Sequence, residues 1–241
     1  MHQSILVFFL LAFVHISVKA DTARTSVDWD GYYTGTIPCG SCPGIKMWLE
    51  LTNIADKTYY KLIEIYENEK EGTFRSEGTG HWHKDGSTLD LKGKDENRTI
   101  FVTENAVIFL GENDKPSAGK FNEAYTLNKL KAFAGGGAQL LIDHSKVKVK
   151  KEGKSRIVNF SGLMNFQHMT EGGHLSLTAD WIIDCKSKTA EMPRINYYSQ
   201  RFATGKLIYS TKKNTNGAQS FAESDQDVIN QVAEEYCHHS Y

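Results

Sequence analysis

The sequence PCGSCPGIKMWLEL, residues 38–51, combines a close cysteine pair with the alternation that decides the fold. Its second half carries apolar residues at every second position, namely Ile45, Met47, Leu49 and Leu51. Because successive side chains of a strand point to opposite faces, this spacing indicates a strand with one buried face. Short runs with similar patterns lie on both sides of this stretch, so we expect a mainly β protein.

The composition is that of an ordinary globular protein. Of the 241 residues, 40% are hydrophobic and 24% are charged, and the chain has 12 Phe, 11 Tyr and 4 Trp. The 28 basic residues are balanced by 29 acidic ones. Since no excess of cations is available to release counterions from a phosphate backbone, we expect no nucleic-acid partner.

The N-terminus has the pattern of an export signal. An apolar run of ten residues, Ile5–Val14, precedes the small residues Val18 and Ala20 at the positions expected before a cleavage site. Ten apolar residues are too few to span a bilayer, and no later segment approaches the required length. We expect a signal peptide at residues 1–20 and a periplasmic or secreted mature chain without a transmembrane segment. No cysteine lies near Ala20, so we also expect that the protein is not a lipoprotein.

The four cysteines are expected to form two disulfides in an oxidising compartment. Three connectivities exist, and sequence proximity favours Cys39 with Cys42 and Cys185 with Cys237. The second bridge would close a loop of about fifty residues and stabilise the fold by about 4 kcal/mol.

Three interpretations of Cys39 and Cys42 remain open: a redox-active dithiol, a soft-metal site and a structural disulfide. A thioredoxin-type enzyme is disfavoured because Cys42 is followed by Pro-Gly and a strand, whereas that chemistry uses a helix N-terminus. Nucleophile-elbow, phosphate-loop and HExxH motifs are also missing from the sequence. We therefore expect no enzymatic activity.

As a metal site, the cysteine pair is incomplete for tetrahedral zinc, although Cu(I) accepts two or three soft ligands. His81 and His83 could add nitrogen ligands, since alternate residues of a strand share a face. The alternative is that both histidines face solvent while Trp82 faces the core. The cofactor hypothesis is therefore copper, bound by Cys39 and Cys42 with His81 and His83 as further candidates.

Alternation and turn residues predict a series of short strands up to about residue 130, which favours a small antiparallel barrel or sandwich. The pattern changes around Gly135–Gly137, and we expect a domain boundary near residue 131, between domains at 21–130 and 131–241. The expected strands of the first domain are Tyr32–Ile37, Lys46–Asn53, Tyr59–Tyr66, Gly72–His83, Thr88–Leu91, Thr99–Thr103, Ala106–Leu110 and Ala124–Lys129.

The second domain is expected to contain strands and one helix, at about Asp225–Tyr236, with Ser224 as its N-cap. Cys237 would attach this helix to the strand ending at Cys185. The helix has an apolar stripe of Val228, Ile229, Val232, Ala233 and Tyr236, and the expected strands are Gln139–Asp143, Lys146–Lys150, Arg156–Met164 and Ser176–Asp184. A basic group could bind an anion or protect an exposed edge strand: Lys146, Lys148, Lys150, Lys151, Lys154 and Arg156.

The segments Gly31–Ile45, Gly78–Trp82 and Leu89–Leu91 together resemble the N-terminal domain of the NlpE family of bacterial envelope proteins. This resemblance covers about residues 28–130 and places the family's CxxC on Cys39 and Cys42. It implies a lipocalin-like barrel, a periplasm-facing location, copper tolerance and envelope-stress signalling. Members of the family are typically lipoproteins, so the absence of a lipidated cysteine is a departure.

Residues from about 131 to 241 resemble the surface-adhesin E domain. The resemblance lies in Gln139–Asp143, Ala179–Cys185, Arg201–Gly205 and the terminal helix ending in Cys237. It implies an α+β domain with an antiparallel sheet, a packed helix and a disulfide. For some relatives it also suggests binding to host or envelope ligands.

The leading hypothesis is a non-enzymatic envelope protein whose barrel responds to copper or redox state through Cys39 and Cys42. Its second domain would bind an envelope or host protein. The alternative is a secreted or surface adhesin-type protein in which the CxxC is only a structural disulfide.

Overall fold

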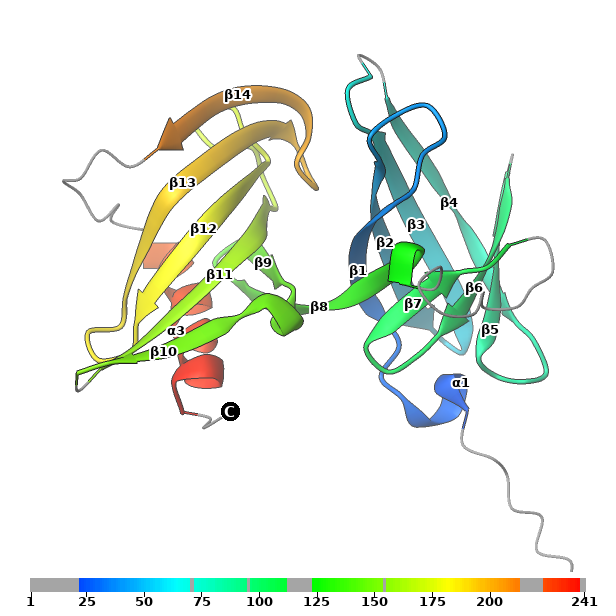
Figure 1. Cartoon of the computed structure of the whole chain (residues 1–241), viewed down its shortest axis with the longest axis horizontal. Helices are drawn as coiled ribbons and strands as arrows, with labels where there is room; N and C mark the ends of the chain where they lie inside the picture. The colour runs from blue at the N-terminus through cyan, green and yellow to red at the C-terminus, as the bar shows by residue number, and fades with distance from the viewer. Residues whose placement is uncertain are drawn as a thin grey trace, which may run out of the picture.

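Strands dominate the architecture, and a single long helix lies near the C-terminus (Figure 1). The computed structural model describes residues 22–69, 72–94, 96–111, 123–153, 155–212 and 223–238. The expected signal peptide, residues 1–20, lies outside the described residues. The expectation of a mainly β protein is confirmed.

The first half of the chain forms a closed antiparallel barrel. The first strand, β1, pairs with both β2 and β8, so the ring of neighbouring strands closes on itself. The barrel expected from the sequence is thus confirmed, and each of the eight expected strands overlaps an observed one. Their bounds are β1 Gly31–Ile37, β2 Ile45–Ile54, β3 Lys57–Tyr66, β4 Thr73–Trp82, β5 Thr88–Gly93, β6 Asn97–Val102, β7 Ala106–Phe109 and β8 Thr126–Gly135.

Side chains fill the barrel interior. The alternation of β2 turns Met47, Leu49 and Leu51 inward, where each is at most 1% exposed. Tyr33 and Leu62 join them from the neighbouring strands in the same core cluster. Burying these apolar surfaces supplies most of the stabilisation of such a domain.

A short helix, α1 (Ala23–Ser26), lies at one end of the barrel beside an aromatic pair (Figure 1). The rings of Trp29 and Trp82 meet edge to face with centroids 5.1 Å apart, and the indole N–H of Trp82 donates to Thr58 Oγ1 at 2.9 Å. The expectation that Trp82 faces the core is therefore confirmed.

Strand β8 belongs to both halves of the molecule. Its residues 126–130 pair with β7 and β1, and its residues 131–135 pair with β9 (Ala138–Ile142). The change of partner falls between Leu130 and Lys131, within one continuous strand. We propose that the chain divides into two domains near residue 131.

The second half is an antiparallel sheet that carries a helix on one face. Two of its strands, β13 and β14, have no counterpart among the expected strands. The sheet order is β8-β9-β11-β12-β13-β14, with β10 paired to β11. The remaining bounds are η1 His144–Lys146, β10 Lys148–Glu152, β11 Ser155–Phe166, β12 Ser176–Asp184, β13 Thr189–Gln200, β14 Thr204–Lys212 and α3 Glu223–His238.

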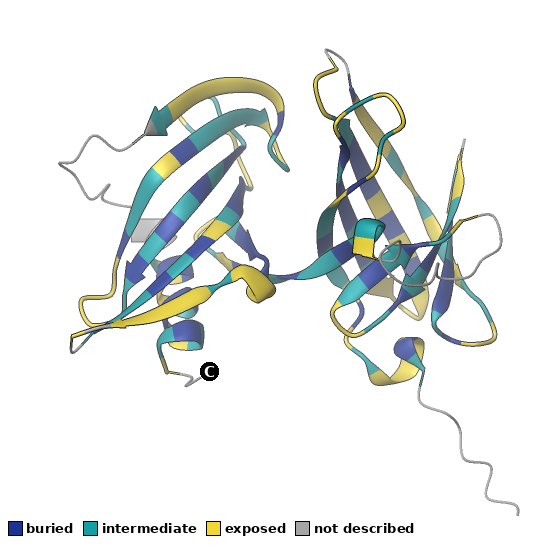
Figure 2. Ribbon diagram, viewed as in Figure 1, coloured by how far each residue is buried: buried dark blue, intermediate teal, exposed yellow. Residues whose placement is uncertain are grey.

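Helix α3 packs on β8, β9 and β11 through its expected apolar stripe. All five residues of the stripe are buried, as Figure 2 shows by the dark side of the helix. The expected N-cap is wrong, however. The helix begins at Glu223, so Ser224 lies inside its first turn, because the acidic and polar start of the segment extends the helix beyond the apolar stripe.

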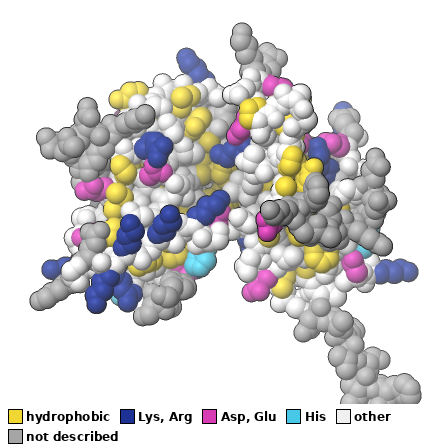
Figure 3. Space-filling model, in the orientation of Figure 1, with side chains coloured by type: hydrophobic (Ala, Val, Ile, Leu, Met, Phe, Trp, Pro, Cys, Tyr) yellow, Lys and Arg dark blue, Asp and Glu magenta, His cyan; other side chains and the backbone are white. Residues whose placement is uncertain are grey.

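The basic group lies largely on β10, at the edge of the second sheet. Among the described residues, β10 pairs only with β11, and Lys148, Lys150 and Lys151 are exposed. Figure 3 shows a row of basic side chains on this half of the molecule. Lys154 lies outside the described residues. Cationic side chains along such a strand oppose pairing with another chain, which is the edge-protection interpretation.

We predict that Leu49→Ala lowers the free energy of unfolding by about 2–5 kcal/mol, because it leaves a cavity in the filled barrel. Ile54→Ala is the matched control on the same strand: Ile54 is 58% exposed, and its loss should cost less than about 0.5 kcal/mol. Urea denaturation measures both values, and equal effects would contradict the inward assignment of Leu49.

Candidate functional site

The cysteine pair lies in the loop that joins β1 to β2. Ile37 and Ile45 face each other as the last pair of the hairpin, so residues 38–44 form the loop. The backbone N–H of Glu67 donates to the carbonyl oxygen of Gly44 at 3.0 Å and attaches the loop to the end of β3. A Cβ at Gly44 would lie 2.6 Å from Thr36 Cγ2, so any larger residue there requires the Thr36 side chain to shift.

Cys39 and Cys42 form a disulfide with their Cα atoms 5.2 Å apart. The N–H of Cys42 also donates to Cys39 Sγ at 3.0 Å. Both cysteines are half-buried against the barrel core, whereas Gly40 and Ser41 between them are exposed. The bridge thus rests on a rigid hairpin and remains accessible to a partner from solvent.

A buried carboxylate that was not predicted from the sequence lies at this end of the barrel. Glu64 lies opposite Met47 on β3, two positions from the loop end of the ladder, and its side chain is 7% exposed. Arg98 Nη2 contacts Glu64 Oε1 at 2.9 Å and Glu96 Oε1 at 2.8 Å. Burial raises the pKa of Glu64 and the positive charge of Arg98 opposes that rise incompletely. The inward alternation of Tyr60 and Leu62 was the signal that could have identified it.

The two histidines lie at the other end of the barrel. Ile45 pairs with Tyr66 at the loop end, whereas Thr58 pairs with Gly80, next to His81, at the far end of the same ladders. At about 3.4 Å per residue, the strands separate these positions by on the order of 25 Å. His81 and His83 therefore cannot complete a metal site with Cys39 and Cys42, because strand register, which the sequence does not reveal, places the two pairs apart.

Each histidine has a local polar contact instead. His83 Nε2 lies 2.9 Å from Asp90 Oδ1, and His81 Nε2 lies 3.3 Å from Thr79 Oγ1. Burial alone would raise the pKa of Asp90, but hydrogen bonds from His83 and Thr99 lower it overall. In the described part of the chain, no three His, Cys, Asp or Glu side chains gather as a metal centre would require.

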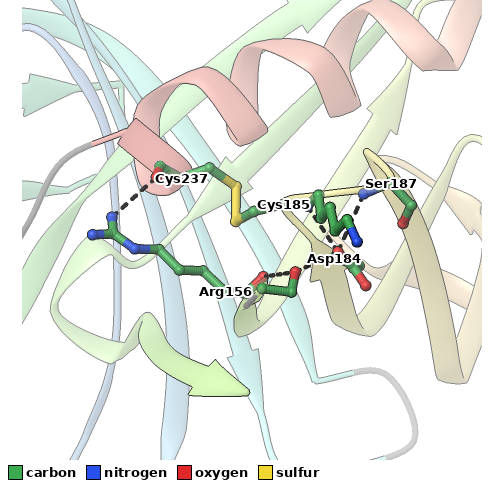
Figure 4. Close-up of a disulfide and its surroundings, with 7 residues drawn as sticks. Arg156, Asp184, Cys185, Ser187 and Cys237 are labelled. Atoms are coloured by element: carbon green, nitrogen blue, oxygen red, sulfur yellow. Dashed lines mark hydrogen bonds between the residues drawn. A yellow bond between two sulfur atoms is a disulfide. The ribbon is translucent and has the colours of Figure 1, made fainter. Parts of the chain in front are cut away.

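The second disulfide joins Cys185, directly after β12, to Cys237 in the last turn of α3 (Figure 4). Arg156 Nη1 donates to the carbonyl oxygen of Cys237 at 3.0 Å, and the carbonyl oxygen of Arg156 accepts from the N–H of Cys185 at 2.9 Å. Asp184 closes the following turn by accepting from the N–H groups of Lys186 and Ser187. The bridge and Arg156 together hold the helix end on the sheet, which is a structural role.

Comparison with known proteins gives two family matches in the same order as the two halves. Residues 33–120 match the NlpE N-terminal domain, and residues 128–238 match surface-adhesin protein E. A search of curated proteins finds no match.

The solved structures that are similar to this chain include the following two. A putative lipoprotein from Shewanella oneidensis is 32% identical, over 46% of this chain and 97% of that one, with a TM-score of 0.40. The Cpx pathway activator NlpE from Escherichia coli is 18% identical, over 63% of this chain and 84% of that one, with a TM-score of 0.32.

We predict different stability costs for the two bridges. Cys185 and Cys237 are 52 residues apart, and replacing both with Ser should cost about 4 kcal/mol, because it releases a long loop in the unfolded chain. Cys39 and Cys42 are 3 residues apart, and the same change should cost about 2 kcal/mol. Guanidinium unfolding without reductant gives both values, and a larger cost for the short bridge would contradict this assignment.

We predict that the free energy of unfolding of the wild type, minus that of Glu64→Gln, increases as the pH falls from 7.5 to 5. Because the folded-state pKa of Glu64 lies above its ordinary value, its ionised form destabilises the fold, and protonation relieves this cost as the pH falls through the folded pKa. The Gln variant has no such proton to bind. Unfolding free energies of both proteins across this range measure the difference, and a pH-independent difference would exclude a raised pKa.

Proposed function

We propose that this chain is a non-enzymatic bacterial envelope protein that responds to copper or redox state, because residues 33–120 match the NlpE N-terminal domain and residues 128–238 match surface-adhesin protein E. The responding group is the pair Cys39 and Cys42. The partner-binding part is the second domain. Among the described residues, no helix is long and apolar enough to span a membrane.

The observation that carries the proposal is the position of the Cys39–Cys42 bridge. It lies in an exposed loop on a filled, rigid barrel, with Gly40 and Ser41 open to solvent between the cysteines. Opening or closing the bond therefore acts first on this loop, which packs against the end of the barrel core. A bridge of purely structural function, such as Cys185–Cys237, instead holds two secondary-structure elements together.

The redox step is thiol–disulfide exchange with an external dithiol. A thiolate of that dithiol attacks one sulfur of the bridge and forms a mixed disulfide, which releases the other cysteine as a thiolate that takes up a proton. The second thiol of the dithiol then resolves the mixed disulfide. Two electrons and two protons pass to Cys39 and Cys42, and the dithiol leaves as a disulfide.

In the reduced state, the pair offers two sulfur ligands. This donor set fits Cu(I), which soft thiolates select and which accepts low coordination numbers, but it does not fit tetrahedral zinc. In this proposal Cys39 and Cys42 are the copper ligands, and His81 and His83, at the far end of the strands, take no part. Copper and the disulfide are alternatives in this proposal, because the same two sulfurs serve both.

The second domain supports an adhesin-type role by its match to surface-adhesin protein E. Its partner would be an envelope or host protein. The competing function is an adhesin whose Cys39–Cys42 bridge is permanently closed, and the contact of Glu67 with Gly44, which keeps the loop attached to β3, favours this second candidate.

We predict that mild reduction opens Cys39–Cys42 and leaves Cys185–Cys237 closed, since the first bridge is in an exposed loop and the second is held between a strand and a helix. Intact-mass analysis after alkylation should show two modified thiols, both in the peptide containing residues 39–42. The reduced protein should then bind one Cu(I), measured by competition with a chromogenic Cu(I) chelator.

The matched control is the Cys39→Ser, Cys42→Ser variant, which should bind no Cu(I) under the same conditions. Opening of both bridges together, or equal copper binding by this variant, would contradict the proposal. Reduction without any copper binding would limit the function to a redox response.

A further inference from the structure

A polar cleft of about 710 Å³ lies where the barrel meets the second sheet. One wall is the outer face of β1 and β2, and the other is the sheet face opposite α3, formed by β11, β12 and β13. The space-filling view shows the surface hollowed between the two halves (Figure 3). Cavities of this size at the meeting of two structural units are common ligand sites.

The cleft has an apolar floor and polar walls. Trp48, Leu130, Leu141 and Leu163 of the floor are each buried in a cluster that joins the two halves. The walls add hydroxyl and amide groups, including Thr36, Asn196 and Tyr198. Such a surface can hold a ligand with a flat or apolar body and a polar head.

Two of the three cations lining the cleft already have carboxylate partners. Lys146 Nζ lies 2.9 Å from Asp143 Oδ2, and Arg194 Nη2 lies 2.6 Å from Asp180 Oδ2. Lys46 differs from them. Within the described residues, no carboxylate lies within 4.0 Å of its ammonium group, which instead sits 5.0 Å from the centre of the Trp48 ring.

Lys46 lacks the partner that an anion would supply, and its ammonium group lies over the Trp48 ring. Burial lowers the pKa of Lys46, and the charge of the more distant Glu67 opposes this only in part. The indole Nε1–H of Trp48 is buried and donates to no acceptor among the described residues. This N–H does not open to the cleft, so a ligand there would contact Trp48 through its ring.

We propose that this cleft binds a small organic anion, with a carboxylate or phosphate head on Lys46 and an apolar or aromatic body against Trp48. The site lies outside the barrel interior and does not involve either disulfide. The proposal therefore does not rest on the copper and redox function proposed above.

The test uses 8-anilinonaphthalene-1-sulfonate, a fluorescent aromatic anion that fits the cleft volume. Lys46→Met keeps an unbranched apolar stem and removes the charge, so it should weaken binding about tenfold or more, the loss expected for a charge-assisted hydrogen bond. Lys92→Met, at an exposed position of β5 outside the cleft lining, should bind as the wild type does. Trp48→Phe, which reduces the aromatic surface available to the body of the ligand, should weaken binding several-fold.

Competition distinguishes the head groups. Phenylacetate or phenyl phosphate should displace the probe. The more effective competitor of the two identifies the head group as carboxylate or phosphate. The neutral phenylacetamide should compete at least tenfold more weakly. Equal probe affinity of the wild type and Lys46→Met would overturn the proposal, as would equal competition by phenylacetamide. Circular dichroism of each variant confirms folding, and Lys46→Met alone decides the matter if Trp48→Phe does not fold.

Discussion

The structure depends on one strand, β8, that pairs with the barrel through residues 126–130 and with the second sheet through residues 131–135. Since hydrogen-bonded ladders run along its whole length, the two halves cannot turn freely about it.

A second contact fixes the angle between the two halves. The turn after β13 places Phe202 against Trp48, with ring centroids 6.0 Å apart, and Arg75 of β4 donates to Thr204 Oγ1 at 2.6 Å. Phe202 and Ala203 have φ values of 60° and 54°, a left-handed conformation that costs about 1–2 kcal/mol per residue and that this packing offsets.

Much of this fold could be predicted because the period of the apolar residues is a local property. Ile45 to Leu51 alternate, and Val228 to Tyr236 repeat at helical spacing, so the barrel strands and α3 followed from the sequence. Strands β13 and β14 did not. Residues 205–210 of β14 are all exposed, so the strand carries no alternation of buried and exposed positions. Its place in the sheet comes from pairing with β13, which only the tertiary structure supplies.

The candidate site shows the same division between local and long-range information. The loop with Cys39 and Cys42 was recognisable from residue type and spacing. The distance to His81 and His83 was not, because it depends on the register of β2 with β3 and of β3 with β4. Glu64 and Trp48 were also missed as site residues. Both lie on strands with alternating apolar residues. Glu64 becomes a site residue through its contact with Arg98, and Trp48 through its packing against the second sheet, and both partners come from elsewhere in the chain.

The molecule has two regions of chemical interest. One is the disulfide loop at an end of the barrel, and the other is the cleft whose walls come from both halves. The cleft exists only if β8 and Phe202 keep these halves in one arrangement. Hydrogen–deuterium exchange of the β8 amides tests this most directly. We expect residues 126–135 to exchange as one protected unit, and Phe202→Ala to lower the protection of β8 and of the facing strands of both halves together. Independent exchange of residues 126–130 and 131–135, unaffected by Phe202→Ala, would contradict the account.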